Sequence, residues 1–381
     1  MGLHAGIAKH MRERMPKVYL DREELRGLPA PQVCVVDFMW LLYRFRGSTG
    51  TQLVRYAQAQ ITSAYDAGCA CFVALGDDDL NMPEQKRDEQ RRRDKRAPDA
   101  NATATAPVLD DDNAPTDWCA ALSNRAFKQA VLHYLHDKLT PPDLKRKTGE
   151  VMLVTRMATR GIRAFRARDG VWSGFHDASM ETAIEGCGEA DVAAARVVEW
   201  LTERTGYKSY VVRTIDSDSI PILLASQARV RCQNATLHLW LPTCERAPAG
   251  EDVLFGVVAN DLHRSAFATS RTGYDTLWSF ETRRIVDIDR MLRSFDDLAC
   301  AWRFCALCVM MGTDFNKKIA HRVGLRDLQT RIARAFKTAH PLRDYPKFFR
   351  IVASDTRLGK GESCQNTGWV LRYWGADSLL P

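Results

Sequence analysis

Residues 33–38 read VCVVDF and residues 70–77 read ACFVALGD, and these two stretches decide the fold class. Each contains a continuous apolar run, without the alternation of a strand that has one face in water. Helical patterns fill the interval, from Phe38 to about Phe45 and from Gln52 to Ala67. Buried strands joined by helices predict a parallel sheet flanked by helices.

The rest of the chain continues this alternation. Helices are expected at residues 117–138 and 189–205 and over most of 288–335, and strands at residues 151–155, 210–215, 235–241 and 253–258. The segment 161–180 fits neither pattern clearly. We therefore expect an α/β protein with a central, mostly parallel sheet flanked by helices and a helical C-terminal part.

Length and composition allow one large domain or two ordinary ones, because the chain has 381 residues, 45% of them hydrophobic. No stretch approaches eighteen consecutive apolar residues, and the N-terminus lacks the apolar core of a signal peptide. We expect no membrane partner. Most of the eleven cysteines lie in apolar surroundings, and Cys305 and Cys308 have no second pair to complete a zinc site. Buried, reduced thiols in an intracellular, reducing compartment are expected.

The net charge of +7 permits a polyanionic partner. Its distribution is more informative, because seven of the eleven residues from Lys86 to Arg96 are basic, in a helix expected from about Pro83. On its own, such a helix is more simply explained as a charged, solvated surface. Residues 97–116, which are rich in Ala, Pro, Thr, Asn and Asp, predict a flexible loop.

Seven acidic positions follow predicted strands or begin predicted helices. A carboxylate in such surroundings is costly unless its charge is compensated, and a pair of divalent metal ions is the usual compensation. In open α/β sheets the carboxyl ends of strands are also where ligands bind. Each position alone is more simply a solvated turn or a helix cap, so the argument rests on the whole set. The positions are Asp37, one of Asp77 to Asp79, Glu189, Asp191, Asp216, Asp218 and Asp314.

The order of these acids, with the basic helix between the second and the third, resembles flap endonucleases and their relatives. Those relatives include 5′→3′ exoribonucleases and viral flap-endonuclease-like proteins. The resemblance covers roughly residues 1–330 and implies a PIN-like 5′-nuclease fold with a helical arch insertion. It rests on Met1-Gly2, on Asp37 with Tyr43 six residues later, on Glu189-Ala190-Asp191, on Ile215-Asp216-Ser217-Asp218 and on Gly312-Thr313-Asp314-Phe315.

The second aspartate of the family pattern has three candidates in this chain. Family members carry a lysine seven residues after this aspartate and an arginine fourteen residues after it. Counted from Asp79, these offsets reach Lys86 and Arg93, whereas Asp77 lies closer to the end of the strand. The spacing favours Asp79, and the choice between Asp77 and Asp79 stays open.

The resemblance also implies roles for individual residues. Two Mg²⁺ ions, with Mn²⁺ as a substitute, would activate a water and stabilise the leaving oxygen. Lys86 and Arg93, seven residues apart on one helix face, would stabilise charge on the scissile phosphate. Tyr43 would stack on a base, with ordinary helix packing as the alternative. Gly2 would lie near the active site, and Arg92 and Arg96 would bind nucleic acid. The metal ligands would be Asp37, Asp79, Glu189 and Asp191 for one ion and Asp216, Asp218 and Asp314 for the other.

Four regions follow from the resemblance. Residues 1–96 would form an N-terminal nuclease region ending in the basic arch helix, and residues 97–150 a flexible loop and arch insertion. Residues 151–330 would form an internal nuclease region and 331–381 a C-terminal extension. The family's helix-turn-helix module, which grips duplex DNA, is degenerate here, since only Val323-Gly324-Leu325 remains of its hairpin. No peptide of the sliding-clamp type is evident near the C-terminus.

The expected function is a metal-dependent, structure-specific 5′-nuclease that acts on flapped or branched DNA in replication, repair or recombination, with the nucleus as the favoured location. The close alternative is an RNA-degrading 5′-nuclease of the host-shutoff or exoribonuclease type. A catalytically inactive nucleic-acid-binding protein belongs to a different class, and the acid retained at every position argues against it. The oligomeric state is left open.

Overall fold

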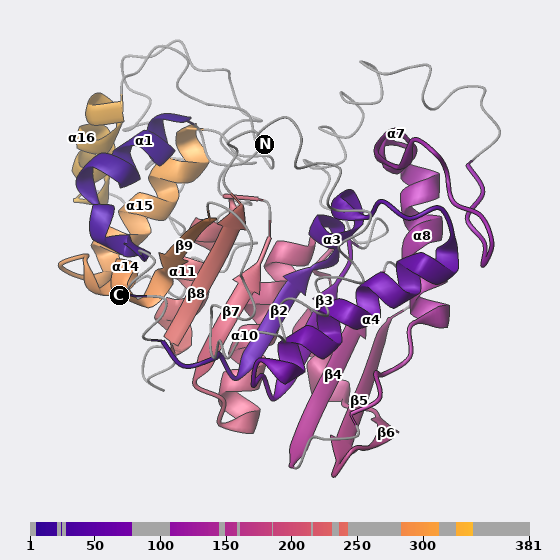
Figure 1. Cartoon of the computed structure of the whole chain (residues 1–381). Helices are drawn as coiled ribbons and strands as arrows, with labels where there is room; N and C mark the ends of the chain where they lie inside the picture. The colour runs from indigo at the N-terminus through magenta and orange to yellow at the C-terminus, as the bar shows by residue number, and fades with distance from the viewer. Residues whose placement is uncertain are drawn as a thin grey trace.

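The computed structural model describes residues 5–20, 24, 28–77, 107–144, 149–157, 161–184, 186–214, 216–230, 236–242, 283–311 and 325–337. These residues build a nine-stranded sheet in the order β1-β9-β8-β7-β2-β3-β4-β5-β6 (Figure 1). The strands are β1 (Tyr19–Leu20), β2 (Val33–Asp37), β3 (Cys71–Leu75), β4 (Glu150–Arg156), β5 (Ile162–Arg168), β6 (Val171–Phe175), β7 (Ser209–Arg213), β8 (Thr236–Pro242) and β9 (Arg283–Asp287).

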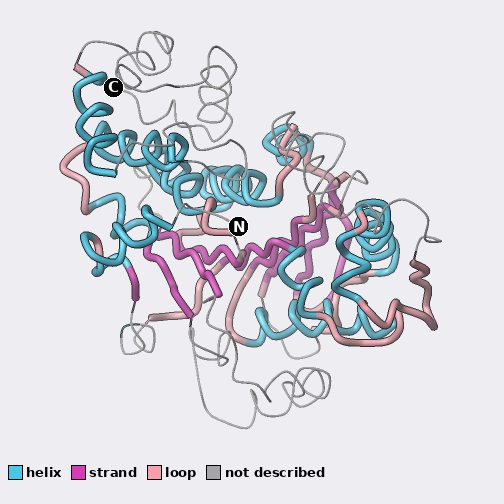
Figure 2. Tube along the Cα trace, turned by 90° about the horizontal axis from the view of Figure 1, so that it is seen from above, coloured by secondary structure: helices cyan, strands magenta, loops and turns pink. Residues whose placement is uncertain are grey.

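Helices cover the sheet on both sides, as the view onto its upper edge shows (Figure 2). They are α1 (Ala5–Arg14), α3 (Phe38–Arg44), α4 (Gly50–Asp66), α7 (Trp118–Ser123), α8 (Arg125–Lys138), α9 (Ala178–Ile184), α10 (Ala190–Thr205), α11 (Ser219–Val230), α14 (Ile288–Arg293), α15 (Leu298–Met311) and α16 (Leu325–Phe336). A 3₁₀ turn, η1 (Pro16–Val18), precedes β1.

The expected α/β class, with helices flanking a sheet whose centre is parallel, is confirmed, and the nine-stranded sheet as a whole is mixed. Its five central strands, β8, β7, β2, β3 and β4, run parallel, and the pairings outside them are antiparallel. The segment that the sequence left ambiguous forms the β5–β6 hairpin. Its turn residues Asp169 and Gly170 have φ values of 50° and 82°. Positive φ at both central positions is typical of the tight turn that joins antiparallel strands.

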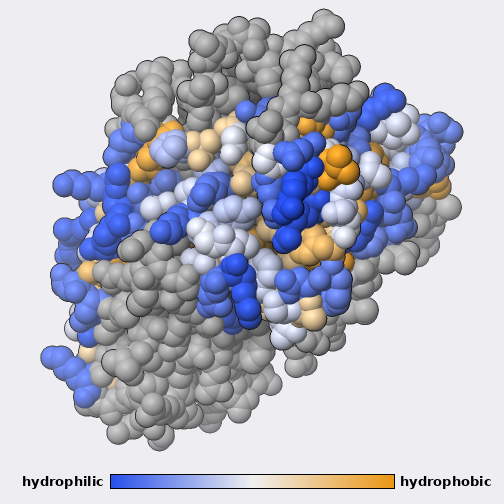
Figure 3. All heavy atoms as spheres, turned by 90° about the horizontal axis from the view of Figure 1, so that it is seen from below, coloured by the Kyte–Doolittle hydropathy of each residue, from blue (hydrophilic) through white to orange (hydrophobic). Residues whose placement is uncertain are grey.

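Alternate residues of the central strands point to opposite faces of the sheet and pack into two separate hydrophobic cores. Val33 and Val35 of β2 belong to the core beneath α1, α9, α10, α11 and α14 to α16. Cys34 and Val36 of the same strand belong to the core beneath α3, α4, α7 and α8. Both faces of β2 are therefore dry, which is why its sequence shows no polar alternation. The view from below shows mostly hydrophilic described residues, with hydrophobic ones in small groups (Figure 3).

The expected elements that fall in the described ranges agree with the structure to within a few residues, with one division. The single helix expected at 117–138 is two helices, because Asn124 caps α8 by accepting a hydrogen bond from Phe127 N at 3.1 Å. The expected basic helix from Pro83 to Arg96 and the expected strand at 253–258 lie outside the described residues.

The described part of the expected flexible loop, residues 107–116, has an irregular backbone that is tied to the start of α4. Gly50 N donates to Asp110 O at 2.9 Å, and Ala114 N donates to Ser48 O at 2.8 Å. These residues therefore pack against the start of α4.

The expected burial of the thiols is confirmed for six of the eight cysteines that the structure describes, whereas Cys300 is partly exposed and Cys119 is exposed. Cys305 and Cys308 are fully buried in α15 and form no disulfide. Burial raises the pKa of both thiols, and it raises the pKa of Cys34 in β2 to about 11. Across the described ranges, helix length and apolarity never reach what a bilayer crossing requires.

We predict that Gly50→Ala loosens the contact between α4 and residues 107–116. An added Cβ would lie 2.3 Å from Asp110 O and 2.6 Å from the Tyr134 hydroxyl oxygen. Overpacking of this kind lowers the free energy of unfolding by about 1–3 kcal/mol. Urea denaturation of the variant and the wild type measures this difference. Gly174→Ala is the control, because its nearest neighbour, Ala164 O, is 4.0 Å away. Equal stability of the two variants would contradict the prediction.

Candidate functional site

The central parallel strands reverse their order at β2, so that later strands are added on both sides of it. In chain order the five parallel strands lie as 3-2-1-4-5, a doubly wound arrangement. The crevice at such a switch point, outside the carboxyl ends of the strands, is where open α/β sheets bind ligands. Asp37 ends β2, Asp77 follows β3 and Asp216 follows β7, so all three lie at this edge, the upper one in Figure 1.

Asp37 is the carboxylate of the central strand and caps the next helix. Its Oδ1 accepts from Met39 N at 2.9 Å and its Oδ2 accepts from the Thr214 hydroxyl at 3.1 Å. Burial, and then the negative charge of Asp77, raise the pKa of Asp37 to about 7. Two hydrogen bonds and the attraction of Lys128 favour the ionised carboxylate, but they do not fully compensate the free-energy cost of ionising it.

Asp77 connects the two helical layers at the same edge. Its Oδ2 pairs with Lys128 Nζ of α8 at 2.5 Å, and its Oδ1 accepts from Ala190 N, the first residue of α10, at 3.2 Å. Buried Arg156 fixes the neighbouring backbone, because its guanidinium donates to Gly76 O at 3.0 Å and to Cys187 O. The segment that carries Asp77 is therefore tied to the loop that precedes α10.

Glu189 and Asp191 stand at the N-terminus of α10, and each is about 7% exposed. Glu189 occupies the N-cap position without a side-chain cap bond, and Asp191 Oδ1 accepts from Val192 N at 2.8 Å. The helix dipole favours negative charge at this end. α10 also packs against β2 and β3, which brings its acidic end to the edge that holds Asp37 and Asp77.

The D-x-D lies in the turn between β7 and α11. Thr214 links this turn to β2, because its hydroxyl donates to Asp37 and accepts from Asp216 N at 3.1 Å. Asp216 Oδ1 in turn accepts from Asp218 N at 3.0 Å. Asp218 is fully buried and approaches α15, where its charge adds to burial and Cys305 in raising the pKa of Cys308. The two carboxylates of the motif therefore point toward different surroundings.

The remaining expected site residues divide into two groups. Tyr43 lies on α3, is 38% exposed and belongs to neither hydrophobic core. The other expected residues lie outside the described ranges, and they are Gly2, Asp79, Lys86, Arg92, Arg93, Arg96 and Asp314. In the part of the chain that the structure describes, no three His, Cys, Asp or Glu side chains come close enough together to hold a metal ion.

The donors at this edge nevertheless fit a divalent cation by their chemistry. They are carboxylate oxygens, which Mg²⁺ and Mn²⁺ prefer over nitrogen or sulfur. The raised pKa of Asp37 reflects first its burial and then the negative charge of Asp77, and a bound cation would lower the cost of ionising this carboxyl.

Three residues of this edge escaped the sequence analysis, namely Lys128, Arg156 and Thr214. Lys128 sits in a helix whose pattern gives no reason to place it inward. Arg156 ends a strand and resembles a solvated residue. Thr214 directly precedes the D-x-D region, so its short polar side chain at a strand end was the one available signal.

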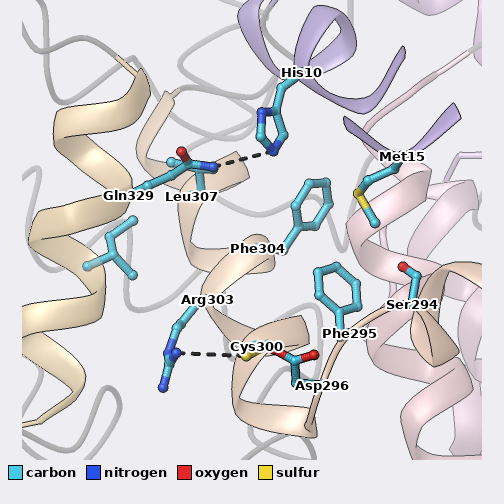
Figure 4. Close-up of a pocket in the computed structure, with 11 residues that line it drawn as sticks. His10, Met15, Ser294, Phe295, Asp296, Cys300, Arg303, Phe304, Leu307 and Gln329 are labelled. Atoms are coloured by element: carbon cyan, nitrogen blue, oxygen red, sulfur yellow. Dashed lines mark hydrogen bonds between the residues drawn. The ribbon is translucent and has the colours of Figure 1, made fainter. Parts of the chain in front are cut away.

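A separate cavity of about 310 Å³ lies among α1, α15 and α16 and beside residues 294–296 (Figure 4). Phe295, Phe304 and Leu307 give it an apolar wall, and His10 and Gln329 meet at 3.4 Å across its rim. None of the residues expected to carry chemistry lines it. The carboxylate-bearing edge is therefore the candidate site.

Comparison of the chain with protein-family models, with curated proteins and with solved structures gives no match.

We predict that Asp37→Asn stabilises the metal-free protein at pH 8 and does so less at pH 5. The pKa of Asp37 is 3.8 in an unfolded chain and about 7 in the folded protein. The folded state therefore carries the full cost of the charge at pH 8, whereas at pH 5 its Asp37 is protonated. The gain at pH 8 should be on the order of 1–2 kcal/mol, reduced by the partial exposure of the carboxyl. Denaturant unfolding of both proteins at the two pH values measures it, and a gain that is larger at pH 5 would refute the charge argument.

Proposed function

We propose that this chain is a metal-dependent 5′-nuclease that hydrolyses phosphodiester bonds in flapped or branched DNA. The observation that carries the proposal is the meeting of acids from four distant segments at one switch point. Asp37, Asp77 and Asp216 lie at or just past the carboxyl ends of three adjacent parallel strands, and Glu189 and Asp191 lie at the N-terminus of α10, which packs on these strands. These carboxylates share one edge of the sheet, and two of them, Asp37 and Asp77, interact electrostatically.

The finer fold proposal follows from the same arrangement. A PIN-like nuclease core is supported by the doubly wound order of the five parallel strands and by the order of the acidic motifs along the chain. The antiparallel strands at both edges would then be additions to that core.

In this reading, bound divalent ions supply the Lewis acidity that activates a water and neutralises the phosphate. Carboxylate oxygens of Asp37, Glu189, Asp191 and Asp216 would hold the ions, joined by Asp77 or Asp79 and by Asp218 and Asp314. The chain's other groups orient these ligands. Thr214 fixes Asp37 relative to the turn that carries Asp216, and Arg156 fixes the backbone beside Asp77.

Residues outside the described ranges complete the proposal. Lys86 and Arg93 would stabilise the developing charge on the phosphate. Gly2, Arg92 and Arg96 would contact the nucleic acid, and the exposed ring of Tyr43 would stack on a base.

We predict that Asp216→Asn lowers Mg²⁺-dependent cleavage by about a hundredfold or more, because a cation ligand that contributes several kcal/mol is lost. Asparagine still offers Asp218 N an acceptor, so the turn should fold. Glu203→Gln, an exposed acid on α10, is the control and should cleave normally. The substrates are a 5′-flapped DNA and a single-stranded RNA, tested side by side with Mg²⁺, with Mn²⁺ and with a chelator.

Faster cleavage of the RNA would replace DNA by RNA as the substrate class. Tight binding of either substrate, without cleavage in any metal, would make the chain a nucleic-acid-binding protein and refute the nuclease proposal.

We predict that, of the two candidates for the second aspartate, Asp77→Asn reduces cleavage more than Asp79→Asn. Asp77 interacts with Asp37 and with the start of α10, which bears the other acids. Single-turnover cleavage of the same substrate by the two variants measures the difference. A larger loss of cleavage in Asp79→Asn would contradict this prediction and would favour Asp79, the ligand that the spacing to Lys86 and Arg93 indicates.

A further inference from the structure

We propose that Lys128 is an internal counter-cation of the carboxylate edge, and that its ammonium group competes with a divalent cation for Asp77. The first part rests on the geometry of the metal-free chain alone. The second part rests on the proposed function, because it requires that the edge binds divalent ions.

The ion pair between Lys128 and Asp77 is largely shielded from water. Nζ and Oδ2 lie 2.5 Å apart, and the two side chains are only 18% and 13% exposed. A surface pair at this distance contributes little because water screens it, whereas shielding from water strengthens the attraction. The positive charge also reaches Asp37, since Lys128 acts to lower the pKa of that carboxyl. One ammonium group therefore offsets two neighbouring negative charges.

The packing of α8 against the end of β3 places Lys128 beside Asp77. Leu132 lies one helical turn after Lys128 and on the same face of α8. Leu132 is fully buried, and its Cδ2 comes so close to Gly76 that a Cβ there would lie 2.8 Å away. The missing side chain at Gly76 lets α8 approach the end of β3, and Asp77 is the next residue.

Each oxygen of Asp77 accepts a hydrogen bond, and the donors at Oδ1 and Oδ2 differ in mobility. Oδ1 accepts from the backbone of Ala190, which is held in α10, and Oδ2 accepts from the end of a flexible lysine side chain. The backbone of Gly76 is fixed by Arg156. A cation that approaches Asp77 therefore meets one partner that is able to move away. An ammonium group has no lone pair to share with a metal ion and is repelled by it.

α8 provides a matched comparison at its other end. Lys138 pairs with Asp111 at 2.9 Å, but the two side chains are 48% and 56% exposed. This pair has the same chemistry on the same helix without the shielding and without neighbouring candidate ligands.

The test compares the wild type with Lys128→Met, Lys128→Arg and Lys138→Met. Methionine keeps an unbranched apolar chain and removes the charge, and arginine keeps the charge. Calorimetric titration with MnCl₂ measures cation affinity, and thermal unfolding in a chelator measures the stability of the metal-free protein. Neither readout depends on cleavage.

The proposal expects Lys128→Met to bind Mn²⁺ about tenfold more tightly than the wild type, which is about 1.4 kcal/mol. The same variant should unfold several degrees lower in chelator, as expected when a shielded carboxylate loses its partner. Lys128→Arg and Lys138→Met should stay near the wild type in both readouts. Unchanged or weaker Mn²⁺ binding by Lys128→Met would overturn the competition.

Two further outcomes separate this proposal from the proposed function. If the wild type and every variant fail to bind Mn²⁺, the nuclease proposal and the competition both fail. The counter-cation role is then decided by the chelator data, and it is overturned if Lys128→Met is as stable as Lys138→Met. If Lys128→Met does not fold, the double variant Asp77→Asn/Lys128→Met replaces it. If the double variant folds, the result supports the charge pairing between Lys128 and Asp77. If the double variant also fails to fold, the counter-cation role is overturned.

Discussion

Burial of negative charge at the end of the central strand is the constraint on which this edge of the molecule depends. β2 is buried on both faces and flanked by strands on both sides, and Asp37 at its end is only partly exposed. A carboxylate in that position is stable only if other groups lower its cost. Two hydrogen bonds, the start of a helix and a lysine from another layer contribute, and the pKa of the carboxyl still remains raised. Asp37 therefore has a perturbed pKa at the switch point of the sheet. Perturbed pKa values of this kind cluster at functional sites.

The two helical layers of the protein meet at Asp77. α8 from one layer and α10 from the other both contact this single side chain, and Gly76 makes the approach of α8 sterically possible. A movement of either layer would therefore alter the environment of the carboxylates. The carboxylate edge is therefore coupled to the packing of both helical layers on the sheet.

Local patterns predicted the central part of this fold well. The runs that became β2, β3 and β7 are apolar on both faces, and the patterns of α4 and α10 repeat at helical spacing, so each element is recognisable without its neighbours. The same logic placed Asp37 and Asp216 at strand ends. The β5–β6 hairpin was missed although Asp169-Gly170 is a strong turn signal, because both flanking strands are partly exposed and β5 carries three arginines. The position of Lys128 could not be predicted, since it depends on contact between Leu132 and Gly76, which are 56 residues apart in the sequence.

The buried cysteines of the sheet give the folded state a chemical property of its own. Cys34 and Cys71 lie on the adjacent central strands, both fully buried, and burial raises the pKa of each thiol. Since the thiolate is the reactive form, these groups should be almost inert to alkylating reagents while the sheet is intact. They become reactive only when the central strands separate, which is the most protected opening a domain undergoes. The rate at which a thiol reagent modifies them would therefore report how often the whole molecule unfolds, with exposed Cys119 as the internal reference for reagent access.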